Sequence, residues 1–89
     1  MIDLTRHARD FLETLPPKQF KQVAKGIFAL LKNPFPVDCK HLSGHPGFRM
    51  IDVGEYRVCY EIADNAVRVI VVGLRNDGAV YKELERVRN

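Results

Sequence analysis

The sequence predicts an α+β domain: an N-terminal helical hairpin packed on a three- to four-stranded antiparallel sheet, with a short C-terminal helix. Apolar residues recur at helical spacing up to residue 32 and alternate with period two from residue 48. Helices that precede strands in this way are typical of the α+β class. A chain of 89 residues forms one domain, with room for one small core and one site at its edge.

Two helices are predicted at the start of the chain, over residues 5–15 and 17–32. Thr5 is suited to cap the first helix, because its hydroxyl can accept a free backbone N–H. Proline cannot continue a helix but fits a first turn, so Pro16 ends one helix and Pro17 opens the next. With almost no loop between them, the helices are expected to fold back as an antiparallel hairpin. The apolar stripe of the second helix comprises Phe20, Val23, Ala24, Ile27, Leu30 and Leu31.

Three strands are predicted after a stretch rich in proline and glycine, residues 34–47. The third strand is apolar on both faces except at Arg68, which places it in the interior of the sheet. In the second strand, alternate residues form one apolar face, which the helices are expected to cover. The strands span residues 48–53, 56–62 and 67–72, the turns lie at Gly54-Glu55 and Asp64-Asn65, and the covered face carries Tyr56, Val58, Tyr60 and Ile62.

The two ends of the chain add smaller elements. Val80, Leu84 and Val87 have helical spacing and predict the C-terminal helix. Residues 1–4 are expected to supply one short edge strand.

Several classes of function are disfavoured by composition. The net charge of +3, from 14 basic and 11 acidic residues, is too small to indicate a nucleic-acid partner by itself. Cys39 and Cys59 are isolated, and Cys59 is expected to pack within its apolar strand as a small hydrophobic residue. The three histidines form no metal-binding motif and are interpreted as solvated loop or helix residues, so neither a disulfide framework nor a metal site is predicted. Nothing resembles a signal peptide, and the longest apolar run, residues 27–31, is too short to cross a bilayer. We therefore expect a cytoplasmic protein with no membrane contact.

Motifs for nucleophilic or cofactor chemistry are equally weak. Ser43 lacks the strand-to-helix turn of a hydrolase nucleophile, and the Gly44-His45-Pro46-Gly47 segment does not match a phosphate-binding loop. No cofactor is expected. The acidic residues near the strands are interpreted as hairpin and surface residues; they are Asp52, Glu55, Glu61 and Asp64.

A set of arginines around the predicted hairpin is the strongest candidate site. Arg57 alternates with the apolar residues of its strand, so it is expected to point away from the helix-covered face. Arg49 is expected in the preceding strand, on the same face as Ile51 and Val53, with Arg75 and Tyr81 beyond the third strand. Together these side chains are expected on the open face and rim of the sheet. Guanidinium groups can bind a phosphate and its developing charge, and a phenol can stack on a base. The alternative is plain surface pairing, of Arg57 with Glu55 or Glu61 and of Arg75 with Asp77.

The segment from Phe48 to Ile62, FRMIDVGEYRVCYEI, resembles the RelE/ParE toxin superfamily. The similarity continues through Val71-Val72-Gly73-Leu74-Arg75 and Val80-Tyr81, and upstream in the loop that starts at Lys40. It implies a single RelE-like toxin domain over residues 1–89, held inactive by a cognate antitoxin.

The RelE-like members cleave mRNA in the ribosomal A site, where a 2′-hydroxyl attacks the adjacent phosphate. The resemblance therefore implies an endoribonuclease whose partners are the ribosome and mRNA. It assigns catalytic roles to Arg57, Arg75 and Tyr81, and substrate binding to Arg49 and Lys40. No metal and no small-molecule cofactor are implied.

The sequence departs from the RelE-like pattern where a general base is expected. Ile51 stands where a lysine is expected, and there is no C-terminal histidine. Arginine stays protonated and is a poor base. His45 and Tyr81 are candidates for the base, with Arg49 acting only through its charge. Two alternatives stay open, a ParE-like inhibitor of DNA gyrase and a catalytically degenerate module that binds an antitoxin.

Overall fold

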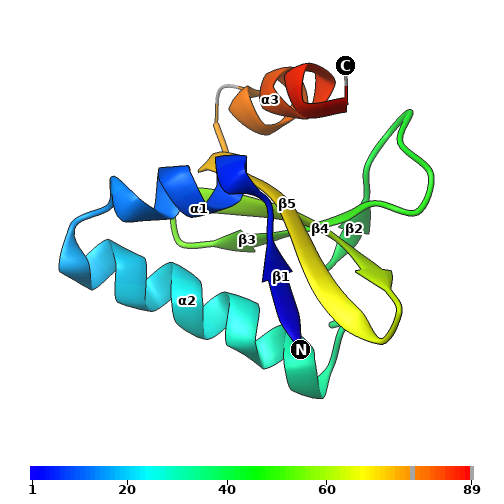
Figure 1. Cartoon of the computed structure of the whole chain (residues 1–89), viewed down its shortest axis with the longest axis horizontal. Coiled ribbons are helices and arrows are strands. Elements are labelled where there is room, and N and C mark those ends of the chain that lie inside the picture. The colour runs from blue at the N-terminus through cyan, green and yellow to red at the C-terminus, as the bar shows by residue number, and fades with distance from the viewer. Residues whose placement is uncertain (77, 89) are drawn as a thin grey trace.

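The computed structural model describes residues 1–76 and 78–88, which form three helices and a five-stranded mixed sheet (Figure 1). The strand order across the sheet is β1-β5-β4-β3-β2. The class is α+β, as predicted, with more strands than expected. The elements are β1 (Ile2–Leu4), α1 (Arg6–Glu13), α2 (Pro17–Lys32), β2 (Lys40–His41), β3 (Arg49–Val53), β4 (Tyr56–Ala63), β5 (Ala66–Leu74) and α3 (Ala79–Arg88).

The helical hairpin is only partly correct as a prediction. The chain does reverse between α1 and α2, and Pro17 occupies the first helical position of α2. However, α1 packs mainly on β5 and α2 contacts β3, and both helices share one core with the sheet. Among the described residues, no helix is long and apolar enough to cross a membrane.

The prediction of a purely antiparallel sheet is wrong at one edge. β1 pairs with β5 in parallel, with Ile2 opposite Val67, and the backbone N–H of Val67 donates to the carbonyl of Met1 at 2.9 Å. At the other edge, the two-residue strand β2 lies within the stretch predicted to be irregular and pairs with β3. Both edge strands are too short for their sequence pattern to reveal a pairing partner.

The two predicted turns have the geometry of tight hairpins. Gly54 has a φ of 59°, which glycine adopts without steric cost. It lies in the turn between Val53 and Tyr56, which pair with each other. Asp64 and Asn65 both have positive φ, as the commonest two-residue hairpin turn requires. These turns fix the register of β3, β4 and β5.

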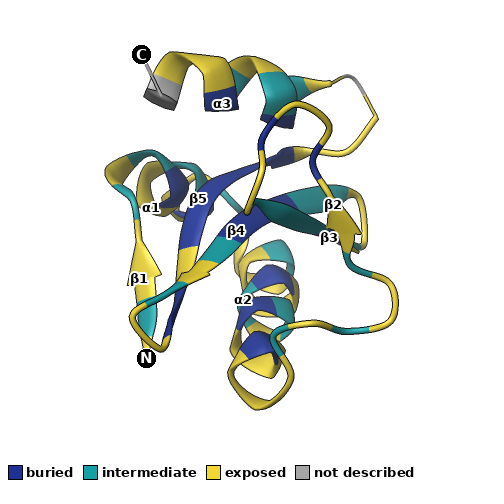
Figure 2. Cartoon of the chain, turned by 90° about the vertical axis from the view of Figure 1, so that its right-hand side faces the viewer, coloured by how far each residue is buried: buried dark blue, intermediate teal, exposed yellow. Residues whose placement is uncertain are grey.

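Both faces of the sheet are buried, one beneath α1 and α2 and the other beneath α3 (Figure 2). Val58 and Tyr60 lie in the first core, as the predicted helix-covered face requires, whereas Ile62 is exposed at its margin. The second core corrects the expectation of an open face. Here Val80 and Leu84 of α3 are buried against Cys59, Ile70 and Val71. The side chain of Val87 lies outside the described residues.

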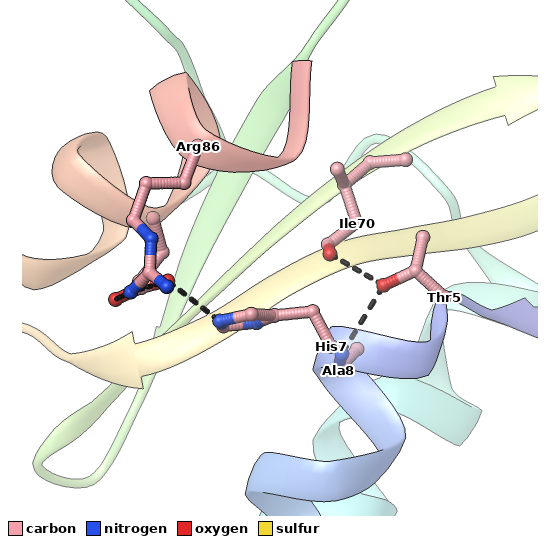
Figure 3. Close-up of polar contacts among 6 residues, drawn as sticks. Thr5, His7, Ala8, Ile70 and Arg86 are labelled. Carbon is pink, nitrogen blue, oxygen red and sulfur yellow. Dashed lines mark hydrogen bonds and ion pairs between the residues drawn. The ribbon is translucent and has the colours of Figure 1, made fainter. Parts of the chain in front are cut away.

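A β-bulge in β5 ties the sheet to α1. Cys59 pairs with Val71 but Tyr60 pairs with Val69, so Ile70 is the additional residue. The carbonyl of Ile70 accepts a hydrogen bond of 2.7 Å from the Thr5 hydroxyl, which itself accepts from the backbone N–H of Ala8 (Figure 3). Thr5 therefore caps α1 as predicted and also satisfies the carbonyl at the bulge.

Helices α1 and α3 are joined directly by polar side chains. His7 Nε2 lies 2.7 Å from Glu83 Oε2, and Arg86 also pairs with Glu83, at 3.2 Å (Figure 3). His7 was expected to be a solvated helix residue. It contacts α3 because that helix folds back over the sheet.

Gly26 allows α2 to approach β3 closely. A Cβ atom at this position would lie 2.6 Å from Cγ2 of Val53, which is below any normal contact. Gly26→Ala gains about 1 kcal/mol of helix propensity but over-packs a β-branched neighbour, which costs about 1–3 kcal/mol. We expect a net loss of stability in urea denaturation, restored by adding Val53→Ala. If Gly26→Ala is instead more stable than the parent, α2 and β3 can move apart enough to accommodate the added methyl group at little cost.

Candidate nucleic-acid interface

The candidate site lies on the α3 side of the sheet, at the end where the β3–β4 hairpin turns. Counting outward from the two-residue turn, Val53 pairs with Tyr56 and Asp52 pairs with Arg57. Side chains alternate along a strand, so Asp52 and Arg57 lie on the face opposite Ile51 and Val58, which are buried beneath the first two helices. Both side chains are therefore directed away from the helix-covered face, as predicted for Arg57.

Asp52 and Arg57 form a two-point ion pair. Arg57 Nε donates to Asp52 Oδ1 at 2.8 Å, and Nη2 donates to Oδ2 at 3.4 Å. The Arg57 side chain remains 20% exposed and the Asp52 side chain 37% exposed, so solvent reaches the pair. The hydrogen bond from Arg57 holds the pKa of Asp52 below its usual value, and the same bond raises the pKa of Arg57. Pairing of Arg57 with a carboxylate was anticipated, but with Glu55 or Glu61 rather than Asp52.

Two further cations surround Asp52. Arg75 and Lys40 both act on its carboxylate and help to lower its pKa. Arg75 follows β5, where its backbone N–H donates to the carbonyl of Glu55 at 3.1 Å, so it is fixed beside the β3–β4 turn. Lys40 lies in β2, opposite Met50, and is exposed. The suggested pairing of Arg75 with Asp77 lies outside the described residues.

Tyr81 borders the same group from α3. It packs against the core beneath α3 and lies close enough to Arg57 to contribute to the raised pKa of that guanidinium. Gly73, opposite Arg57, lies directly beneath the start of α3, since a Cβ added there would be in van der Waals contact with Val80 at 3.4 Å. We call the set of Asp52, Lys40, Arg57, Arg75 and Tyr81 the Asp52 cluster.

Arg49 lies on the other face of the sheet and does not join the Asp52 cluster. Its Nη1 donates to Cys39 Sγ at 3.6 Å, and its guanidinium carbon lies 4.5 Å from the centroid of the Phe35 ring. Arg49 does lie on the face of Ile51 and Val53, as predicted, but that face is covered by α1 and α2, so the expectation that Arg49 shares an open face with Arg57 is wrong. Residues that pair across the hairpin lie on the same side of the sheet. Arg49 pairs with Tyr60, which is buried beneath the first two helices, so Arg49 lies on that side and Arg57 lies on the other.

The position expected to hold a lysine also faces the core. Ile51 is buried beneath α2, where a charged amine would be desolvated. His45, proposed as a candidate base, is not a solvated loop residue but is buried, with Nε2 3.3 Å from Oε1 of Glu85.

Other titratable groups of the sheet are structural. Burial raises the pKa of Cys59 to about 12, so its thiol stays protonated and packs as a small apolar group, as predicted. Burial likewise raises the pKa of Tyr60, whose hydroxyl donates to the carbonyl of Pro34 at 2.7 Å. Within the described part of the chain, no three His, Cys, Asp or Glu side chains are grouped to hold a metal ion.

Asp52 is the member of the cluster that sequence analysis missed, because it was interpreted as a surface residue. The signal was present in the turn. A two-residue loop at Gly54-Glu55 makes the second residue before it face the second residue after it, which pairs Asp52 with Arg57.

Comparison with solved structures identifies the fold. A variant of Escherichia coli toxin RelE in the free state has a TM-score of 0.78 and 25% identity, covering 97% of this chain and 94% of RelE. The isolated E. coli RelE toxin gives 0.74 and 26%, covering 100% and 98%. The toxin–antitoxin complex RelBE2 of Mycobacterium tuberculosis gives 0.73 and 29%, covering 84% and 96%.

No protein-family model matches the sequence, and no curated protein sequence matches it. The structural similarity nevertheless extends over nearly the whole chain and recurs among many RelE structures. The chain has a RelE-like fold, and these structural neighbours support its assignment to the RelE/ParE toxin superfamily.

Proposed function

We propose that this chain is the toxin of a toxin–antitoxin pair and acts as an endoribonuclease on mRNA in the ribosomal A site. The observation that supports the proposal is the Asp52 cluster, in which Arg57 is paired with Asp52 at the end of the sheet and Arg75, Lys40 and Tyr81 act on that pair through their charges. The similar structures provide further support, because they are RelE toxins and several are complexes with the antitoxin RelB.

In this reaction, the 2′-oxygen of a nucleotide attacks the adjacent phosphorus and the bond to the 5′-oxygen breaks. The products are a 2′,3′-cyclic phosphate and a 5′-hydroxyl; one proton leaves the 2′-oxygen and one is delivered to the 5′-oxygen. Negative charge develops on the phosphate oxygens in between. Cationic donors that are already in place stabilise such charge without reorganisation.

Arg57 is suited to this role while it remains paired. Asp52 uses the Nε hydrogen and one Nη2 hydrogen of Arg57, which leaves both Nη1 hydrogens and one Nη2 hydrogen for a phosphate. Arg75 neutralises charge at the leaving oxygen, and Tyr81 stacks on or orients the nucleotide. Lys40 binds the RNA backbone. If Arg49 binds the RNA substrate, it does so from the opposite face of the sheet.

The proposal is tested by controlled expression in bacteria, with mapping of mRNA 5′ ends by primer extension. We expect growth arrest, with new ends inside codons of translated messages and none in an untranslated copy. Arg75→Ala and Tyr81→Ala, with folding verified by circular dichroism, should relieve the arrest. Arrest with intact messages and stabilised gyrase–DNA cleavage complexes would indicate gyrase inhibition, and harmless expression of folded protein would indicate a binding module.

Asp52 is expected to weaken RNA binding, because its carboxylate repels phosphate. Asp52→Asn should tighten binding of a short RNA about fivefold, the equivalent of about 1 kcal/mol of repulsion between charges roughly 4 Å apart in water. Fluorescence anisotropy at fixed salt measures this change. Glu61→Gln is the matched control, since Glu61 pairs with Arg68 at 3.6 Å outside the Asp52 cluster. Weaker binding by Asp52→Asn would mean that Asp52 chiefly orients Arg57.

A further inference from the structure

Helix α3 carries Tyr81 of the Asp52 cluster, but its apolar contacts do not by themselves fix the direction of that side chain. Val80 and Leu84 are both buried in the second core and are four positions apart, so they form one narrow stripe along the helix. Apolar contacts have no preferred direction, so a helix seated on such a stripe can rotate about its own axis. Rotation of α3 would carry Tyr81 toward or away from Arg57.

Two carboxylates of α3 lie on opposite sides of this stripe, and each contacts a histidine from another part of the fold. At 3.6 residues per turn, Glu85 lies on the same side as Tyr81, one turn further along, and Glu83 lies on the other side. Glu83 Oε2 is 2.7 Å from Nε2 of His7 in α1. Glu85 Oε1 is 3.3 Å from Nε2 of His45, in the loop between β2 and β3 that rises toward α3 in Figure 2.

The contact with α1 has the geometry of a strong hydrogen bond. The distance of 2.7 Å is typical of a bond to a charged carboxylate. The other ring nitrogen of His7, Nδ1, is buried and has no hydrogen-bond partner among the described residues, so the ring is oriented by Glu83. The start of α1 is itself fixed to the sheet through the bond from Thr5 to the carbonyl of Ile70 (Figure 3). His7 therefore offers Glu83 a donor whose position is set by β5.

The contact with the loop also involves a ring that is fixed in place. His45 is 7% exposed, and its ring stacks on that of Phe48, with the two planes 7° apart. Its backbone N–H donates to the carbonyl of Leu42 at 3.2 Å, and its carbonyl accepts from the N–H of Phe48 at 3.1 Å. The side chain of Glu85 is 65% exposed. An otherwise mobile carboxylate on α3 is thus anchored to a rigid loop.

We propose that His7 and His45 are positioning residues that prevent rotation of α3 and so keep Tyr81 at the Asp52 cluster. Rotation in one direction lengthens the contact of Glu83, and rotation in the other lengthens that of Glu85. Ion pairs with an exposed partner add little to stability, so the effect of these contacts is on orientation. The inference deepens the proposed function and rests on it, because the direction of Tyr81 matters for the reaction when this side chain contacts RNA.

The first measurement is made on the free full-length protein and does not require cleavage. NMR of protein with labelled tyrosine rings observes Tyr81 separately from Tyr60, which is buried in the first core. His7→Leu and Glu85→Ala each remove one contact, and each should shift the ring resonances of Tyr81 while leaving those of Tyr60 unchanged. Glu85→Ala replaces an exposed side chain, so this variant keeps the fold. Unchanged Tyr81 resonances in both variants would overturn the proposal.

The second measurement is single-turnover cleavage of a ribosome-bound message at increasing protein concentration. His7→Leu and Glu85→Ala should each lower the maximal rate about tenfold, because a displacement of about 1 Å can cost up to about a hundredfold. The half-saturating concentration should stay within about twofold, since the cations that attract RNA are unchanged. His7→Gln should recover most of the rate, because its side-chain amide can donate to Glu83. A loss confined to the half-saturating concentration would contradict positioning.

The decisive comparison adds His7→Leu to Tyr81→Ala. If His7 acts through Tyr81, the double variant cleaves within about twofold of Tyr81→Ala alone, as expected for residues that act as a unit. A further tenfold loss, about the effect of His7→Leu in the parent, would mean that His7 supports the fold in general and would overturn the proposal.

Arg86→Ala is the matched control. Arg86 pairs with Glu83 at 3.2 Å within α3, so this contact connects the helix to no other element, and the side chain is 77% exposed. Its replacement should leave the Tyr81 resonances and the cleavage rate unchanged, and a loss as large as that of His7→Leu would contradict the proposal. If the parent protein does not cleave RNA, the proposed function fails, whereas the ring resonances still decide whether the two histidine contacts orient Tyr81.

Discussion

Arg57→Ala is expected to reduce mRNA cleavage on translating ribosomes by about a hundredfold or more, the usual cost of removing one preorganised donor from developing charge. Arg57 is the cation whose geometry is fixed most firmly, through two hydrogen bonds to Asp52. Alanine removes the guanidinium and leaves the Asp52 carboxylate without its partner, so the attraction of the Asp52 cluster for phosphate weakens. Single-turnover cleavage of a defined ribosome-bound message measures the effect.

The control for this experiment is Arg68→Ala. Arg68 also belongs to the sheet and pairs with a cross-strand carboxylate, that of Glu61, but it lies outside the Asp52 cluster. Its replacement should leave the cleavage rate within about twofold, because an exposed ion pair contributes little to stability. Equal losses in the two variants would point to general electrostatic attraction of RNA rather than to a site at Arg57.

Leu84→Ala is expected to be the most destabilising of the substitutions considered, by about 3 kcal/mol. Leu84 has no exposed surface and belongs to the core that holds α3 on the sheet. Alanine leaves a cavity among Cys59, Ile70 and Val71, which the rigid strands cannot fill. A domain of this size is stable by only about 5–13 kcal/mol, so the loss is a large fraction.

Urea denaturation followed by circular dichroism measures this loss. Leu74→Ala is the matched control, since Leu74 is 46% exposed at the end of β5, and we expect it to cost less than about 1 kcal/mol. Tyr81 is positioned by α3, so Leu84→Ala should also impair cleavage under conditions where the variant is still folded. A Leu84→Ala variant as stable as Leu74→Ala would mean that α3 contributes little to the core.

Local patterns in the sequence were sufficient for most of the elements. Pro17 marked the start of α2, Thr5 the cap of α1, and the turns at Gly54 and Asp64 the ends of the hairpins. These signals depend on dihedral preferences and on side chain–backbone hydrogen bonds within a few residues. These signals can therefore be recognised in the sequence without knowledge of the rest of the fold. The run of resembling residues then indicated the RelE/ParE superfamily, an assignment that the structural neighbours support.

The candidate site was predicted less completely. Arg57, Arg75 and Tyr81 were selected from the sequence, but their catalytic roles remain predictions. Asp52 was overlooked although the turn register exposes its pairing, and Arg49 was grouped with Arg57 although it stacks on Phe35 behind the sheet. These errors arise because a side chain's face depends on cross-strand register, which a list of charged residues does not contain.

The sequence by itself determined the α+β class, the first two helices and the hairpin turns, because each depends on short-range spacing, and its resemblance indicated the superfamily. Only the tertiary structure decided that β1 joins β5 in parallel, that α3 closes the second face, and that Asp52 holds Arg57. Contacts such as that of Thr5 with Ile70 connect residues 65 positions apart. They form only when the whole chain has folded, since no local preference specifies which distant partner a short strand or a single side chain will meet.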